Sequence, residues 1–147
     1  MHVRGLTILE LLVALALLGT LAAIALPNVT ALRSRWQLSA AARQVVMDLK
    51  VARTRAIADV ANHRVRFAVQ GSSYQAQRQG PDGSYANDGM PVALPDGIAI
   101  DACTATAAAV GFRPQGNAST FGTITLRNDA GAQRRIVVDM VGRMRIE

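Results

Sequence analysis

Few side chains in this 147-residue sequence could take part in catalysis or hold a metal ion. The sequence has two histidines, His2 and His63, and one cysteine, Cys103. A single cysteine excludes an intramolecular disulfide and a cysteine-cluster metal site, and so small a number of histidines does not make a histidine-rich one. The aspartates are scattered, and most lie in turn sequences, where they bond the local backbone. We therefore predict that the chain is not an enzyme and holds no metal or other cofactor.

Arginine dominates the charge of the chain. The formal net charge is +6, and Lys50 is the only lysine. The planar guanidinium group suits phosphate and carboxylate groups, so a basic surface permits contact with nucleic acid or anionic lipid. The alternative is that these arginines form a solvated basic face without a ligand.

An apolar run near the N-terminus contains a single acid, Glu10. It is the only charged residue from Leu6 to Leu26. These about 21 residues, at ~1.5 Å each in a helix, span ~30 Å, which is the thickness of the hydrocarbon core of a bilayer. A carboxylate inside a bilayer costs roughly 2.5–3.5 kcal/mol on insertion scales, so an acid at this position indicates a function.

Three interpretations of this run compete. Ala23 and Ala25 match the small-residue pattern of a secretory signal, which would be cut after Ala25 to release a soluble binding domain. A plain signal anchor fits the length of the run but gives Glu10 no purpose. The third interpretation takes Gly5 and Glu10 together.

The sequence Gly5-Leu6-Thr7-Ile8-Leu9-Glu10 resembles the processing site of type IV pilins and type II secretion pseudopilins. The resemblance implies that a prepilin peptidase cuts between Gly5 and Leu6, and that the new N-terminal Leu6 is methylated. It further implies that Glu10 pairs with an N-terminal amine during filament assembly. The family usually has phenylalanine after the cut, where this chain has Leu6.

The same resemblance implies partners and a location. The expected partners are other pilin or pseudopilin subunits, the prepilin peptidase and the bacterial inner membrane. The chain would cross that membrane once, place its head domain in the periplasm and be incorporated into a pilus or pseudopilus.

The helical pattern continues beyond the apolar run, and strands follow it. Seven apolar residues recur at spacings of three and four, which predicts one buried face of a helix; they are Leu38, Ala42, Val45, Leu49, Ala52, Ala56 and Val60. The helix is expected from about Leu6 to Ala61. After it, alternating apolar residues and turn sequences predict strands over 63–69, 74–79, 92–94, 98–103, 120–127, 133–139 and 143–146.

These elements give an α+β fold, in which a long N-terminal transmembrane and assembly helix packs on an antiparallel β-sheet head. We divide the chain into a prepilin leader (1–5), a transmembrane half of the helix (6–27), an amphipathic half (28–61) and a periplasmic β head domain (62–147).

Two further patterns resemble the head signature of the GspH/FimT group of minor subunits. One is Phe112-Arg113-Pro114-Gln115-Gly116 followed by Gly122-Thr123-Ile124-Thr125-Leu126, and the other is a C-terminal hairpin ending in Gly142-Arg143-Met144-Arg145-Ile146. The resemblance implies a structural subunit of a type II secretion pseudopilus or a type IV pilus, which serves protein secretion or pilus assembly.

Some minor pilins of this group bind DNA through a Gly-Arg-x-Arg string, and Gly142 to Arg145 match it. In a strand, Arg143 and Arg145 would point to one face, about 7 Å apart, close to the phosphate spacing of a DNA strand. Arg134 and Arg135 could extend such a patch. The alternative is that Gly142 allows a tight turn and that the arginines solvate an edge strand.

Overall fold

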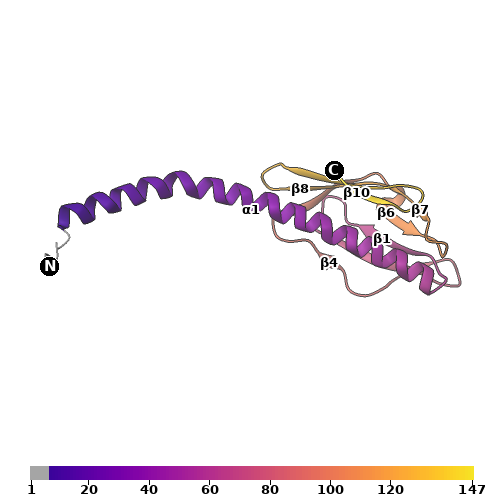
Figure 1. Ribbon diagram of the computed structural model, residues 1–147. Coiled ribbons are helices and arrows are strands. Elements are labelled where there is room, and N and C mark those ends of the chain that lie inside the picture. Colours follow the sequence, from indigo (N-terminus) through magenta and orange to yellow (C-terminus); the bar gives the residue numbers. More distant parts are fainter. Residues whose placement is uncertain (1–6) are drawn as a thin grey trace, which may run out of the picture. The chain divides into compact units, whose positions relative to one another are not determined.

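The computed structural model describes residues 7–147, apart from the side chains of residues 24–31. Its long helix α1 (Ile8–Ala58) precedes all the strands. The chain forms two compact units, one ending at Ser34 and one running from Arg35 to Glu147. Figure 1 shows the elements of both units. The predicted leader, residues 1–5, lies outside the described residues.

A side-chain cap marks the start of α1. The Oγ1 atom of Thr7 accepts a hydrogen bond of 3.2 Å from the backbone N–H of Glu10. A threonine in this position satisfies one of the free N–H groups of the first turn, and an acid three residues later is favoured by the helix dipole. The helix therefore begins two residues after the predicted start at Leu6.

The second half of α1 buries the predicted apolar face. Leu38, Ala42, Val45, Leu49, Ala52 and Ala56 are all buried, as the spacing predicts. Val60 is the exception: it is 77% exposed and has a φ of 50°, because the helix has already ended at Ala58. The prediction that the helix and its apolar face reach Val60 was wrong by about one turn.

Ten strands follow the helix and form two antiparallel sheets. The first sheet has the order β3-β2-β1-β6-β7, with β4 also paired to β2, and the second has the order β10-β9-β8-β5. Their bounds are β1 (His63–Phe67), β2 (Ser73–Gln79), β3 (Tyr85–Asn87), β4 (Val92–Ala93), β5 (Ile98–Cys103), β6 (Ala109–Phe112), β7 (Ala118–Thr120), β8 (Gly122–Asn128), β9 (Gln133–Val138) and β10 (Met144–Ile146). A short 3₁₀ turn, η1 (Thr106–Ala108), precedes β6.

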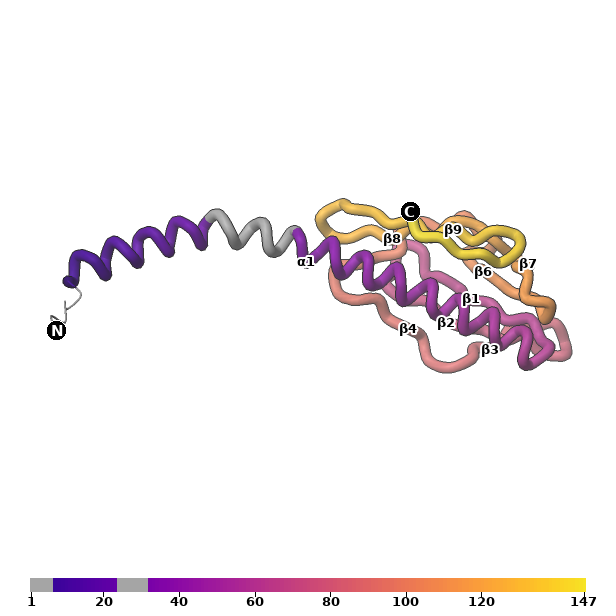
Figure 2. Tube along the Cα trace, in the orientation of Figure 1, coloured from indigo at the N-terminus to yellow at the C-terminus, as the bar shows by residue number. Residues whose placement is uncertain are grey.

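The helix and both sheets share one hydrophobic core within the unit that begins at Arg35. In this unit α1 runs along the strands, with the β9–β10 hairpin beside it on one side and β3 and β4 on the other (Figure 2). The largest fully buried side chains come from the helix and from both sheets, and they include Leu49, Phe112, Ile124 and Ile136. The β9–β10 hairpin is thus fixed next to the helix by burial of its inner face.

The structure adds three strands and breaks one. β3, β6 and most of β7 fall where no strand was expected. The strand predicted over 120–127 is divided at Phe121, where the chain passes from the first sheet to the second. Gly122 has a φ of 158°, and an added Cβ there would lie 2.7 Å from the backbone nitrogen of Ala105. The passage of the chain from the first sheet to the second therefore depends on close packing of Gly122 against Ala105, which a single sequence does not reveal.

Candidate functional site

The C-terminal Gly-Arg-x-Arg string begins in the turn between β9 and β10. The N–H of Asp139 donates to the carbonyl of Arg143 at 3.0 Å, and the N–H of Gly142 donates to the carbonyl of Asp139 at 2.9 Å. Gly142 has a φ of +83°. This pattern is a three-residue hairpin loop that ends on a left-handed residue, a place where glycine avoids the steric cost of a Cβ.

The turn between β6 and β7 has the same construction. The N–H of Arg113 donates to the carbonyl of Asn117 at 2.9 Å, and the N–H of Gly116 donates to the carbonyl of Arg113 at 2.8 Å. Gly116 has a φ of +82°. Each of the two sequence patterns that suggested the GspH/FimT group therefore contains the glycine of one of two equivalent turns.

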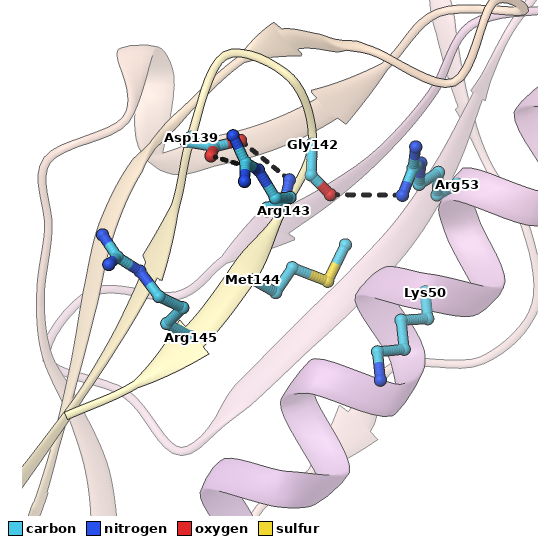
Figure 3. Close-up of a pocket in the computed structure, with 7 residues that line it drawn as sticks. All are labelled: Lys50, Arg53, Asp139, Gly142, Arg143, Met144 and Arg145. Atoms are coloured by element: carbon cyan, nitrogen blue, oxygen red, sulfur yellow. Dashed lines mark hydrogen bonds and ion pairs between the residues drawn. The ribbon is translucent and has the colours of Figure 1, made fainter.

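Arg53 of α1 joins these two turns. Its Nε atom donates a hydrogen bond of 2.6 Å to the carbonyl of Gly116, and its Nη1 atom donates one of 3.4 Å to the carbonyl of Gly142. The turns also touch directly, since an added Cβ at Gly142 would lie 2.9 Å from the Gly116 oxygen. Figure 3 shows the Arg53 side chain reaching from the helix to Gly142. One guanidinium group thus fixes both signature turns to the helix.

A cavity of about 390 Å³ opens beside this junction, between α1 and β10. Four of its seven lining residues are cationic, and the only acid is Asp139; the full set is Lys50, Arg53, Asp139, Gly142, Arg143, Met144 and Arg145. Figure 3 shows Met144 pointing toward the helix and Arg145 pointing away from it. The cavity is therefore cationic, but its charges lie on different sides of β10.

Asp139 neutralises part of this charge. Its carboxylate accepts a 2.8 Å hydrogen bond from the backbone N–H of Arg143 and lies 3.3 Å from the Nε atom of the same residue. The backbone bond, followed by the charge of Arg143, lowers the pKa of the Asp139 carboxyl group. Among the described residues, Lys50 and Arg145 have no ion-pair partner. Arg53 has no ion-pair partner among the described residues either, but it donates to the two turn carbonyls, so Lys50 and Arg145 are the cavity cations whose charged groups form neither an ion pair nor a hydrogen bond within the described residues.

The β9–β10 register places the predicted arginines on specific faces. Arg145 lies opposite Val137, so it shares the outer face of the sheet with Arg135, two residues along β9 from Val137. Arg134 alternates with Arg135 and lies on the opposite face, together with buried Ile136. The structure therefore brings Arg135 and Arg145 together and separates Arg134 from them.

The N-terminal site residues are only partly described. Gly5 and Leu6 lie outside the described residues. Glu10 is exposed in the first turn of α1. In the described part of the chain, no helix combines the length and the hydropathy of a membrane span.

His63 and Cys103 have structural surroundings. The His63 ring is 2% exposed and lies between Asp59 and Asp88, with Nε2 at 3.0 Å and Nδ1 at 3.6 Å from their carboxylates. Burial raises the pKa of the Cys103 thiol, which makes it a weak nucleophile. Among the described residues, no group of three or more histidine, cysteine or acidic side chains could hold a metal ion.

Comparison with known families identifies the chain. The family described as "Type II transport protein GspH" matches residues 41–142, and the prokaryotic N-terminal methylation motif matches residues 1–26. The chain belongs to the GspH family. It is a minor pseudopilin of type II secretion and type IV pilus-like systems, and this family is structural rather than enzymatic. Both sequence resemblances are thereby confirmed.

Solved structures share the fold. The minor pseudopilin EpsH from the type 2 secretion system of Vibrio cholerae matches with a TM-score of 0.60 and 16% identity, over 76% of this chain and 96% of that one. The type IV minor pilin FimU of Pseudomonas aeruginosa PAO1 matches with a TM-score of 0.60 and 18% identity, over 77% and 90% of the two chains. Curated protein sequences contain no significant match. The predicted α+β pilin-like fold is confirmed.

Membership has consequences for processing and location. The methylation motif implies pilin-type partners and processing by a prepilin peptidase, and it suggests a membrane-anchored pseudopilin. The residue that sequence reasoning missed is Arg53, which lies between the buried Ala52 and Ala56 of the apolar face. Its position beside the stripe gave no signal, because Arg43 and Lys50 lie equally close to the same stripe and are exposed.

Proposed function

We propose that this GspH-family chain is cut between Gly5 and Leu6, methylated on Leu6 and held in the bacterial inner membrane with its head in the periplasm. From there it enters a pseudopilus or pilus as a minor subunit. Its partners in this proposal are other pilin-type subunits. The mechanical element is α1, which leaves the membrane and packs among the helices of neighbouring subunits.

The exposure of the first half of α1 carries this proposal. Nine large apolar side chains lie between Ile8 and Leu21, and each is 53% to 82% exposed; they are Ile8, Leu9, Leu11, Leu12, Val13, Leu15, Leu17, Leu18 and Leu21. A helix that is apolar on all sides needs apolar surroundings, which a bilayer or a bundle of similar helices supplies. The same surface thus suits both stages of the proposed cycle.

The mature N-terminus tests the processing step. A start at Leu6 carrying a methylated amine is expected when the chain is isolated from membranes and sequenced by mass spectrometry. A start at Leu26 would instead establish the secreted soluble domain. In a Gly5→Ala variant, retention of residues 1–5 is expected, because the peptidase site has been altered.

Glu10 is proposed to align the subunit with an N-terminal amine in the filament. Such a pair is strong in a low-dielectric setting, and a misaligned carboxylate would stay uncompensated. Glu10→Ala is expected to leave membrane insertion intact and to reduce recovery of the subunit in sheared filaments. Thr7→Val is the matched control, because it removes the helix cap that Thr7 provides and keeps the acid. An equal loss in both variants would show that Glu10 acts through the helix start, against the proposal.

DNA binding is the second candidate function, supported by the shared outer face of Arg135 and Arg145 and by nearby Arg143. Phosphate contacts of this kind are independent of sequence and weaken with salt. An Arg143→Ala, Arg145→Ala double variant of the full chain in detergent is expected to lose retention on DNA at low salt. Arg134→Ala is the control, since Arg134 lies on the other face. Unchanged retention of the double variant would rule this function out.

A further inference from the structure

β10 is an open edge of the second sheet. The strand order of this sheet ends at β10, which pairs with β9 alone. The N–H of Asp139 bonds the carbonyl of Arg143, and Arg135 and Glu147 exchange two backbone bonds of 3.0 and 2.8 Å. Hydrogen-bonded pairs alternate along an antiparallel ladder, so Arg145 is bonded to β9, whereas the N–H and C=O groups of Met144 and Ile146 point outward.

These outward groups have no partner among the described residues. No backbone or side-chain hydrogen bond to the N–H or C=O of Met144 or Ile146 is present. The Ile146 side chain is 41% exposed on the inner face of the strand. An uncovered edge of this kind is the surface to which an extended peptide adds as a further strand.

Unpaired cations flank the edge on both sides. Lys50 lines the cavity from α1, on the side to which Met144 points, and Arg145 projects from the opposite side of β10. Neither has an ion-pair partner among the described residues, whereas Arg143 is paired with Asp139 and Arg53 bonds the two turn carbonyls. A strand laid against β10 would therefore meet one positive charge on each of its faces.

We propose that the β10 edge binds an extended acidic segment of another protein by strand addition. Successive residues of a strand point to opposite faces, so two neighbouring acids in the segment would reach Lys50 and Arg145 respectively. Outward backbone groups of Met144 and Ile146 supply the main-chain bonds, and exposed Ile146 supplies an apolar contact. The proposal extends the minor-subunit function and does not depend on the processing of the N-terminus.

A second copy of this chain does not fit the site. Its ten acidic residues are dispersed, and the closest two, Asp96 and Asp101, are five positions apart. No segment of the chain carries the neighbouring acids that the edge requires. Charge also opposes self-association, since each copy has a formal net charge of +6. The occupant is therefore a different protein.

DNA fits the edge less well than a peptide does. The two free cations lie on opposite sides of β10, and DNA has no backbone N–H and C=O groups in a strand arrangement to pair with Met144 and Ile146. Retention of DNA by the outer face of the sheet would depend on Arg145 and Arg135. It would not change when an outward N–H group of β10 is removed. The two ligands can thus be separated by a backbone substitution.

Ile146→Pro is that substitution. Proline removes the outward N–H of Ile146 and costs no bond to β9, and proline is tolerated on edge strands. Ile146→Ala is its matched control, because it shortens the side chain but keeps the N–H. Lys50→Gln tests the charge on the helix side and leaves the hairpin untouched.

The probe is a fluorescent, terminally blocked peptide, Thr-Val-Asp-Glu-Val-Thr, titrated into the full chain in detergent at low salt. Binding is expected to weaken about tenfold with Ile146→Pro, since a main-chain bond and the fit of the strand are both lost. It should weaken about threefold with Lys50→Gln and by less with Ile146→Ala. The Asn-Gln form of the peptide is expected to bind more weakly than the acidic form.

Three results would overturn the proposal. They are an absence of binding to the unsubstituted chain, binding that is unchanged by Ile146→Pro, and single-stranded DNA binding with the same losses in all three variants. Far-ultraviolet circular dichroism of each variant excludes unfolding as the cause of a loss. Failure of this test would leave the processing and assembly proposals unaffected, because those rest on the N-terminal segment.

Discussion

Replacing Arg53 with alanine should loosen the C-terminal hairpin from the helix. The Nε bond to the Gly116 carbonyl is 2.6 Å long, and Gly116 and Gly142 are both buried. A hydrogen bond from a charged donor contributes about 1.5–3 kcal/mol, and a buried carbonyl left without a partner adds to the loss. The 3.4 Å bond to Gly142 lies at the limit of hydrogen bonding and contributes little. We expect Arg53→Ala to reduce the free energy of unfolding by about 2 kcal/mol.

Two further variants separate the hydrogen bond from the charge. Arg53→Lys keeps the positive charge and most of the aliphatic stem, but an ammonium group does not hold a donor in the fixed position of the Nε–H that bonds Gly116, so we expect about half the loss. Arg43→Ala removes an exposed arginine from the same helix and should change stability by less than about 0.5 kcal/mol.

The assay is urea unfolding of the full chain in detergent, followed by tyrosine fluorescence, with hydrogen exchange to localise the change. In Arg53→Ala, the amides of Ala118 and Gly142 should exchange faster, because the Ala118 N–H donates to Met140 of the other turn and the Gly142 N–H closes the β9–β10 turn. An equal loss of stability in Arg53→Ala and Arg43→Ala, or unchanged hydrogen exchange in these turns, would refute the proposal that Arg53 holds the two turns to the helix.

Two other predictions concern the hairpin turn. Gly142→Ala should destabilise the chain by about 2–3 kcal/mol, because the added Cβ is disfavoured by the left-handed φ and would also lie too close to the Gly116 oxygen. Gly131 has a similar φ but open space around it, so Gly131→Ala should cost only about 1 kcal/mol. The difference between the urea midpoints of the two variants measures the cost of the close approach. The pKa of the Asp139 carboxyl group is lowered in the folded chain, so its charge stabilises the turn at a pH above the usual carboxyl pKa, and this contribution is lost as the pH falls through the folded-state pKa. The difference in stability between the unsubstituted chain and Asp139→Asn should therefore shrink between pH 7 and pH 3. A constant difference would contradict this prediction.

Local patterns predicted the helix and the strongest strands. The stripe from Leu38 to Ala56 has the period of a helix, and the residues of β1 and β9 alternate or cluster as strands do. These features depend on neighbours in sequence, which is the information that one chain contains. Two of the shortest strands did not follow: β3 and β7 have three residues each, and their pairing is decided by the sheet that they join.

Individual residues of the C-terminal hairpin site were predicted from the sequence, but the contacts that bring them together were not. Gly142 was recognised as a possible turn residue and Gly116 as part of a family pattern, but they are 26 positions apart and nothing in the sequence indicates that they touch. Arg53 is farther still from both, and its bonds to them span 63 and 89 positions. Contacts of this kind follow from the docking of the helix on the sheets, so they require the tertiary structure.

The four residues from Gly142 to Arg145 share a string but do four different things. Gly142 completes a left-handed turn against Gly116, Arg143 is held by Asp139, Met144 points to the helix and Arg145 remains unpaired. A ligand that binds through charge must displace Asp139 to gain Arg143, whereas Arg145 is available without such a cost. Any anion that binds this hairpin should therefore depend on Arg145 more than on Arg143, although the string alone presents the two arginines as equivalent.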